Sequence, residues 1–300
     1  MSAPTLRVSF IVASAIVIAA CSSRRTEPSS SEGDRQPASE PASDEEHGGT
    51  QSPPTTTAQA PAGVYTAIDV QNGGNIVGHV RWSGPRPPME PLPVTKNPEI
   101  CGTTAPFPAL TIGEGDGVQF TVVYLEGITR GRALPQIAAD AMPVMDQTSC
   151  QYTPHVMTVG LRQQFGIRNS DPTLHNVHGF FANDESWFNL AQPTRGMTTR
   201  RNAERAGPVR IVCDAGHTWM LGYVHVFPHP YHAVTDASGA FRIEGVPPGS
   251  YTVKAWHEGW RVTGTTAGRP VFGAPVVLTQ SVTVAAGRDA TTDFQLSDGA

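Results

Sequence analysis

The chain lacks the short motifs that mark the common classes of enzyme. Its 300 residues contain no Gly-x-Ser-x-Gly nucleophile elbow, no His-Glu-x-x-His metal motif and no glycine-rich phosphate loop. A Cys-x-x-Cys-His haem attachment site is also missing, so no covalently bound c-type haem is expected. We therefore expect a protein that is not an enzyme, and any electrons that it handles must come from and go to other proteins.

No apolar run in the chain is long enough to span a bilayer. The N-terminal run at residues 8–20 follows Arg7 and has about thirteen residues, which is typical of a secretory signal peptide. It ends in Ile-Ala-Ala-Cys at residues 18–21, which resembles the lipobox of bacterial lipoproteins. This resemblance implies acylation of Cys21 and an exported protein, lipid-anchored to the bacterial cell envelope and facing the periplasm or the cell surface. The alternative is a plain signal peptide with an incidental cysteine.

Large apolar residues are almost absent from residues 22–63, where Ser, Pro, Thr, Glu, Asp and Ala dominate. Such a composition cannot bury enough apolar surface to offset the entropy of ordering, so it predicts a flexible tether. The charged residues from Arg24 to Glu46 are seven acidic and three basic, and they account for most of the net charge of -5. The rest of the chain is near neutral, which gives no support for nucleic-acid binding and limits membrane contact to the lipid anchor.

Helical periodicity is also missing beyond the signal peptide. The remaining residues, about 235 of them, are enough for one large or two small domains. They are rich in short β-branched runs that Gly and Pro separate. This pattern predicts an all-β fold.

Two short segments carry residues that bind soft metals. Residues 213–220 read CDAGHTWM, and residues 169–176 read NSDPTLHN. Strand-like runs at 158–169 and 208–213 precede the histidine of one segment and the cysteine of the other. A cysteine, two histidines and a methionine are the ligands of a mononuclear blue-copper electron-transfer site, because sulfur favours Cu(I) and imidazole suits both oxidation states.

These two segments resemble the ligand segments of the cupredoxins, the plastocyanin and amicyanin type of blue-copper domain. The resemblance covers roughly residues 145–228 and implies a Greek-key β-sandwich, which we assign to residues 129–228. It implies copper as cofactor, with His175, Cys213 and His217 as equatorial ligands and Met220 as axial ligand. The spacing of three and then two residues between the last three ligands departs from most mononuclear families, and position 209, where a binuclear centre needs a second cysteine, is valine. His178 is a fallback ligand.

The C-terminal part resembles a second family. Residues 235–257, with turns at Asp-Ala-Ser-Gly and Pro-Pro-Gly, are similar to the carboxypeptidase regulatory-like domain, a small transthyretin-like β-sandwich. Its usual first strands are missing just upstream, but residues 76–82 and 118–125 have the right order and alternation. We therefore expect this sandwich to comprise residues 64–128 plus 229–300, with the copper domain inserted in it or joined to it. A separate N-terminal module is the competing interpretation.

The four cysteines fit this arrangement. With Cys21 acylated and Cys213 on copper, Cys101 and Cys150 remain to form a disulfide in an exported protein. The alternative is a second metal site with Cys150 and His155. The remaining histidines are expected to have structural roles: His225, His229 and His232 at the surface or in turns, and His79, His155 and His257 within strands.

Three functions are compatible with the sequence. The first is an electron carrier that exchanges electrons with redox partner proteins such as periplasmic cytochromes, through the edge of His217 at an apolar surface that includes Trp219. The second is a lipoprotein that stores or delivers copper. The third is a surface module that binds carbohydrate or protein, with copper secondary.

Overall fold

The structure, a computed structural model, describes residues 64–299, which fold almost entirely into β-strands. The predicted all-β class is confirmed. The predicted signal peptide with Cys21 and the predicted tether lie outside these residues. One α-helix, α1 (Pro98–Cys101), and two 3₁₀ helices, η1 (Glu114–Asp116) and η2 (Ala139–Ala141), occur in the described range. None of these helices is long and apolar enough to cross a membrane.

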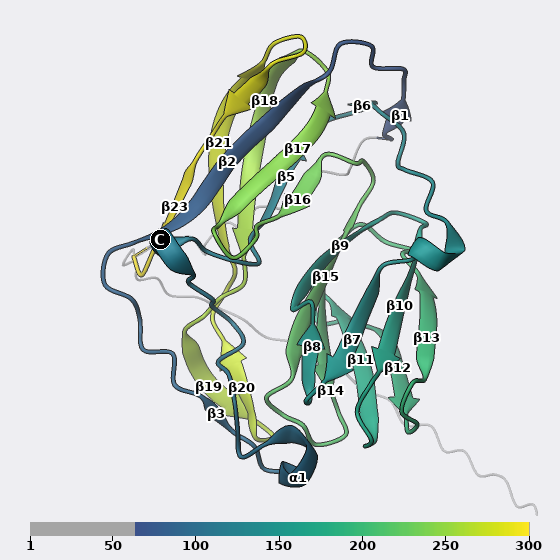
Figure 1. The fold of residues 1–300 in the computed structure, drawn as a ribbon, viewed down its shortest axis with the longest axis vertical. Coiled ribbons are helices and arrows are strands. Elements are labelled where there is room, and N and C mark those ends of the chain that lie inside the picture. Colours follow the sequence, from purple (N-terminus) through teal and green to yellow (C-terminus); the bar gives the residue numbers. More distant parts are fainter. Residues whose placement is uncertain (1–63, 300) are drawn as a thin grey trace, which may run out of the picture. The chain divides into compact units, whose positions relative to one another are not determined.

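Residues 144–227 form two sheets, here called the β7–β15 sandwich (Figure 1). One sheet has the order β13 (Thr198–Asn202), β10 (Gln164–Asn169), β7 (Val144–Thr148) and β8 (Gln151–Thr153). The other has the order β12 (Ser186–Gln192), β11 (His175–Phe181), β14 (Gly207–Cys213), β15 (Leu221–Phe227) and β9 (Val156–Gly160). Side chains from both sheets share one apolar core, so the chain crosses repeatedly between two packed layers.

A second sandwich, here called the split sandwich, combines strands from before and after residues 144–227. One sheet has the order β16 (His232–Val234), β5 (Val122–Glu126), β18 (Gly249–His257) and β21 (Val276–Val284). In the other, β2 (Gly74–Ser83) pairs with β17 (Ala240–Val246), β22 (Asp289–Thr291) and β23 (Phe294–Ser297). The expected pairing of residues 76–82 and 118–125 with strands after residue 235 is thus confirmed. This pairing contradicts a separate N-terminal module, while the domain boundaries themselves stay a prediction.

The two sandwiches pack against each other through β15. Every residue of β15 is buried, because one face of the strand enters the core of the β7–β15 sandwich and the other meets the split sandwich. On the second face, Tyr223 and Phe227 join Val122 of β5 and Trp256 of β18 in one apolar cluster. The ring of His225 lies against Trp256, with 4.2 Å between the ring centroids. This interface holds the two sandwiches together.

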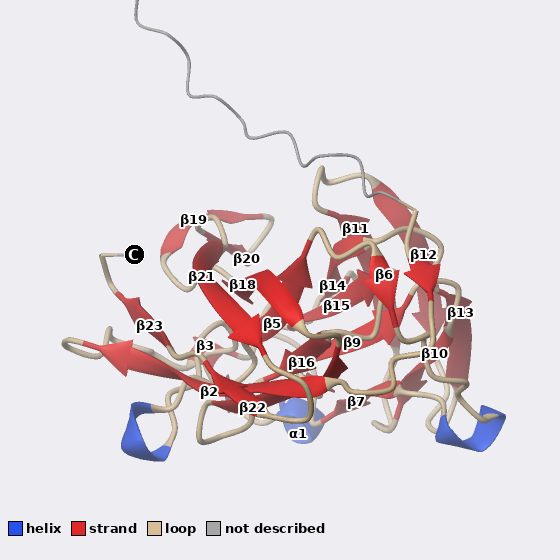
Figure 2. Ribbon diagram, turned by 90° about the horizontal axis from the view of Figure 1, so that it is seen from above, coloured by secondary structure: helices blue, strands red, loops and turns tan. Residues whose placement is uncertain are grey.

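Three smaller pairs of strands complete the described part of the chain (Figure 2). Strand β1 (Thr66–Ala67) pairs with β6 (Arg130–Gly131), and β3 (Leu92–Pro93) pairs with β4 (Thr104–Ala105). A hairpin of β19 (Val262–Thr266) and β20 (Arg269–Phe272) is inserted between the neighbouring strands β18 and β21. Cys101 and Ala105 belong to the core of the β7–β15 sandwich. We call residues 92–105 the cover segment, because they cross over the loop that follows β14.

Candidate metal centre

The four predicted ligands lie at one end of the β7–β15 sandwich. His175 begins β11 and Cys213 ends β14, and these strands are neighbours with Val177 opposite Cys213. His217 and Met220 follow in the loop between β14 and β15. His175, Cys213 and His217 are completely buried, and Met220 is 1 % exposed. The structure therefore brings together residues that are up to 45 positions apart in the sequence.

The three strong donors converge. The Sγ atom of Cys213 lies 3.7 Å from Nδ1 of His175 and 3.5 Å from Nδ1 of His217. Each residue has a ligand atom within 4.8 Å of the other two. A nitrogen and a sulfur that each lie about 2.0–2.3 Å from one metal ion are about 3.5–3.8 Å apart at tetrahedral to trigonal angles. The observed sulfur–nitrogen distances therefore fit a bound copper ion, and Met220 belongs to the same apolar core as Cys213.

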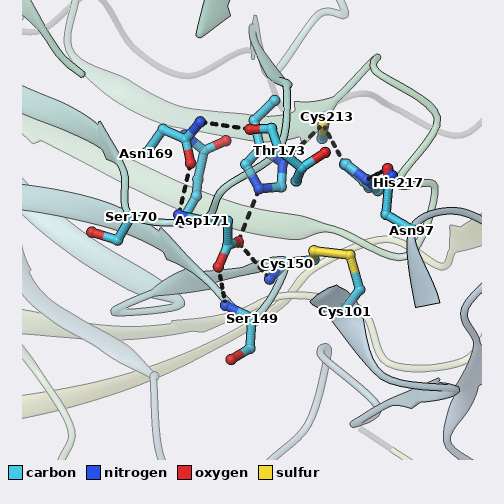
Figure 3. A network of polar contacts seen from close by, with 12 residues as sticks. Asn97, Cys101, Ser149, Cys150, Asn169, Ser170, Asp171, Thr173, Cys213 and His217 are labelled. Atoms are coloured by element: carbon cyan, nitrogen blue, oxygen red, sulfur yellow. Dashed lines mark hydrogen bonds and ion pairs between the residues drawn. A yellow bond between two sulfur atoms is a disulfide. The ribbon is translucent and has the colours of Figure 1, made fainter. Parts of the chain in front are cut away.

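Hydrogen bonds select the ring nitrogen that each histidine turns toward the sulfur. Nε2 of His175 donates to Oδ2 of Asp171 at 3.0 Å. Nε2 of His217 donates to Oδ1 of Asn97 at 3.0 Å (Figure 3). These bonds occupy Nε2 and turn Nδ1 of each ring toward the sulfur, which is how partners outside the ligand shell orient metal-binding histidines. Both imidazoles thus present Nδ1 as a ligand.

The turn before His175 explains the sequence pattern at residues 169–176. The Asn169 amide donates to the carbonyl oxygens of Thr173 and Gln192, each at 2.8 Å, and its Oδ1 accepts from the Asp171 backbone N–H at 2.9 Å. The Asp171 carboxylate in turn accepts from the backbone N–H groups of Ser149 and Cys150, at 2.7 and 2.8 Å (Figure 3). The Asn and Asp of the motif therefore fix the loop that presents His175.

The surroundings favour the thiolate form of Cys213. Burial alone would raise its pKa, but hydrogen bonds with His175 and His217 outweigh burial and lower the pKa from 9.0 to about 6. For His175, burial alone would lower the pKa, but the hydrogen bonds with Asp171 and Cys213 raise it to about 9. A thiolate is the form of cysteine that binds metal. The copper-free protein therefore already holds its sulfur in the binding form at neutral pH.

The lowered pKa of Cys213 predicts a specific pH dependence for the copper-free protein. Since the pKa of Cys213 is depressed to about 6, the thiol should ionise around that pH, and copper binding should weaken as pH falls through it. The ultraviolet absorbance of the thiolate, taken as the difference from a Cys213→Ser variant, measures this ionisation. A midpoint near 9 would show that the histidines do not stabilise the thiolate.

The structure contradicts the expected exposure of His217. Its imidazole is completely buried, and Trp219 is only 4 % exposed, with its indole N–H donating to the carbonyl oxygen of Cys150 at 3.0 Å. Asn97 of the cover segment lies over the outer nitrogen of His217. The prediction is wrong because the cover segment is about 120 residues away in the sequence and no local pattern shows where it packs.

Cys101 and Cys150 form a disulfide, with 5.2 Å between their Cα atoms. The bond joins the cover segment to the loop between β7 and β8, and its sulfurs lie within 4.8 Å of a His217 nitrogen (Figure 3). It contradicts the alternative metal site with His155, whose ring instead pairs with the buried carboxylate of Glu258. Within residues 64–299, Cys213 is the free cysteine.

The other histidines lie outside the centre. His178, the fallback ligand, faces away from it and bonds with Asp214 at 2.6 Å and Ser186 at 2.8 Å. His225 and His229 were expected at the surface or in turns, but they are 3 % and 5 % exposed. Burial lowers their pKa values to about 3 and about 4, so both are neutral. They pack in the interior because β15 and the residues after it lie between the two sandwiches.

Three residues at the centre have no counterpart in the sequence predictions. Asn97 bonds to His217, Lys96 Nζ donates to the carbonyl oxygen of Ala215 at 2.6 Å, and Arg269 bonds to the backbone of the same loop. The Cys101–Cys150 pairing is the one sequence signal for the first two, since it places residues near 101 beside residue 150. No signal indicates Arg269.

Comparison with known proteins supports the resemblance of the C-terminal part. The family model of the carboxypeptidase regulatory-like domain matches residues 223–297, so that predicted resemblance is confirmed over this range. The match begins within β15 and extends through β23. No curated protein matches the chain.

Solved structures of cupredoxins are similar to part of the chain. A purple cupredoxin from Nitrosopumilus maritimus is 19 % identical, with a TM-score of 0.26 over 28 % of this chain and 99 % of that one. A reduced Cu(I) form of an amicyanin variant is 22 % identical, with a TM-score of 0.26 over 30 % of this chain and 86 % of that one. A second reduced amicyanin variant is 17 % identical, with a TM-score of 0.27 over 35 % of this chain and 98 % of that one. The assignment of the centre rests on its own geometry.

Proposed function

We propose that the protein is a copper-binding electron carrier, tethered to the bacterial cell envelope through an acylated Cys21 and the acidic segment that follows. The observation that carries the proposal is the convergence of Cys213 Sγ with Nδ1 of His175 and His217 at 3.7 and 3.5 Å. In this assignment these three residues hold the copper and Met220 caps it. The bound metal would supply a one-electron couple between Cu(I) and Cu(II).

The burial of the ligands favours electron transfer over catalysis. Metal sites that act on substrates keep an open position, whereas three strong donors and a methionine leave none. All four side chains are buried, and hydrogen bonds hold both imidazoles in place without the metal. A donor set that is held in one geometry has little to rearrange when the charge of the metal changes. Burial also disfavours the rapid release that copper delivery requires.

The route for electrons differs from the one that the sequence suggests. Because Asn97 covers His217, we propose that electrons cross the cover segment next to Asn97 rather than a bare imidazole edge. Thr95, Lys96, Pro98 and Glu99 are exposed around it and offer a contact surface. Transient redox complexes bury less than about 1,200 Å² in total, so a partner such as a periplasmic cytochrome needs only a small contact surface.

Replacing Asn97 with alanine tests the role of the cover. The variant removes the acceptor for Nε2 of His217, so the imidazole loses its orientation, and we expect copper affinity to fall by about 10-fold or more. Competition with a chromogenic Cu(I) chelator measures the affinity. Asn72→Ala, in an exposed turn of the split sandwich, is the matched control and should bind as the unmodified protein does. Equal affinities for both variants would show that Asn97 does not orient His217.

A further inference from the structure

The guanidinium group of Arg269 lies against the loop that carries three of the four proposed ligands. Nη2 of Arg269 donates to the carbonyl oxygen of Cys213 at 2.7 Å, and Nη1 donates to the carbonyl oxygens of Met220 at 3.1 Å and Thr218 at 3.2 Å. Arg269 begins β20, so it belongs to the hairpin inserted in the split sandwich. Its side chain is only 21 % exposed.

These bonds join the two ends of the ligand loop. Cys213 is the last residue of β14 and Met220 is the residue before β15, so a single planar group ties the first ligand of the loop to the last. The guanidinium presents its donors in a fixed fork, which a flexible ammonium group does not. Arg269 therefore restricts how far the Cys213 and Met220 backbones can separate.

The same contacts place positive charge beside the centre. Arg269 is always protonated, and its Nη2 lies 3.6 Å from Asp214 Oδ1, which compensates part of the charge. On the other side of the loop, the Lys96 ammonium donates to the carbonyl oxygen of Ala215. A fixed cation destabilises the more positive, oxidised state of a nearby metal centre more than the reduced state.

We infer that Arg269 is a positioning residue through which the split sandwich holds the ligand loop and raises the reduction potential of the centre. The effect on the potential rests on the proposed electron-transfer function. The hold on the loop does not, because the hydrogen bonds exist in the protein without copper. The β19–β20 hairpin thus couples the carboxypeptidase regulatory-like part of the chain to the metal centre.

Hydrogen exchange of the copper-free full chain tests the hold on the loop. In Arg269→Gln, amides of residues 213–220 should exchange roughly 10-fold faster or more, because the variant loses up to three hydrogen bonds. Arg269→Lys keeps the positive charge but lacks the planar set of guanidinium donors, and it should give an intermediate exchange rate. Arg261→Gln removes an equal charge from an exposed side chain that pairs with Asp298, and it should leave the loop unchanged. If the amides of residues 213–220 exchange at the same rate in Arg269→Gln as in Arg261→Gln, the inference is overturned.

The reduction potential of the copper-loaded proteins tests the effect of the charge. It should fall in Arg269→Gln, fall less in Arg269→Lys and stay constant in Arg261→Gln. Faster loop exchange with an unchanged potential would refute the claim about the potential and support the claim about the loop. If neither the unmodified protein nor any variant binds copper, the proposed function fails, while the exchange rates still decide whether Arg269 holds the loop.

Discussion

Replacing Cys213 with serine should abolish the intense visible absorption of the copper-loaded protein and its rapid electron exchange. The sulfur is the one donor that both imidazoles approach, and a hydroxyl group neither ionises near neutral pH nor binds Cu(I) as strongly as a thiolate. We expect this change to have the largest effect on function of any single substitution in the chain. Absorption spectra and stopped-flow electron exchange of the copper-loaded variant measure both losses.

The β fold should survive the Cys213→Ser change. Serine is close to cysteine in size, and the core of the β7–β15 sandwich has many other buried apolar side chains. The circular dichroism spectrum of the copper-free variant provides the control for folding. His178→Ala is the control for the ligand set, because His178 faces Asp214 and Ser186 rather than the centre, and it should keep the visible band. A strong band that persists in Cys213→Ser would show that another residue supplies the ligand.

Removing the Cys101–Cys150 disulfide should have the largest effect on stability. The two cysteines are 49 positions apart, and opening a loop of that length should lower the free energy of unfolding by about 2–4 kcal/mol. Urea denaturation of the copper-free Cys101→Ser/Cys150→Ser double variant measures the loss. The physical reason is that the bond restricts the unfolded chain and also ties the cover segment to the sandwich beneath it.

Cys213→Ser serves again as the control, since it replaces a buried sulfur without opening a loop. If the free energy of unfolding falls no further in the double variant than in Cys213→Ser, the disulfide contributes nothing beyond its packing. We also expect the double variant to admit water to His217, because Asn97 lies four residues from Cys101 and depends on the same segment. Faster exchange of the His217 ring proton measures this opening.

The sequence identifies the residues that converge at the candidate centre because the information is local. Cys213, His217 and Met220 share one loop, and the Asn and Asp of the 169–176 motif build the turn before His175 through their own side chains. The alternating runs at residues 76–82 and 118–125 predict two core strands of the split sandwich for a similar reason. Alternation of apolar and polar residues indicates a strand with one buried face, whichever strand it pairs with.

The cover over His217 is not predictable in this way. Asn97 and Arg269 reach the ligand loop from 120 and 56 positions away, through contacts that impose no periodicity on the sequence. The burial of His225, by contrast, has a signal in the sequence. The segment LGYVHVF at β15 is almost continuously apolar, which is typical of a strand that is buried on both faces. That run predicts an interior position for His225.

A redox titration of the copper-loaded protein, followed by its visible absorption, tests the central claim most directly. An electron carrier with the proposed ligands should show an intense band that disappears on one-electron reduction, returns fully on reoxidation, and is missing in Cys213→Ser. Copper that binds without a reversible couple, or that carries an exchangeable water molecule, would contradict the electron-carrier function and favour copper storage or delivery.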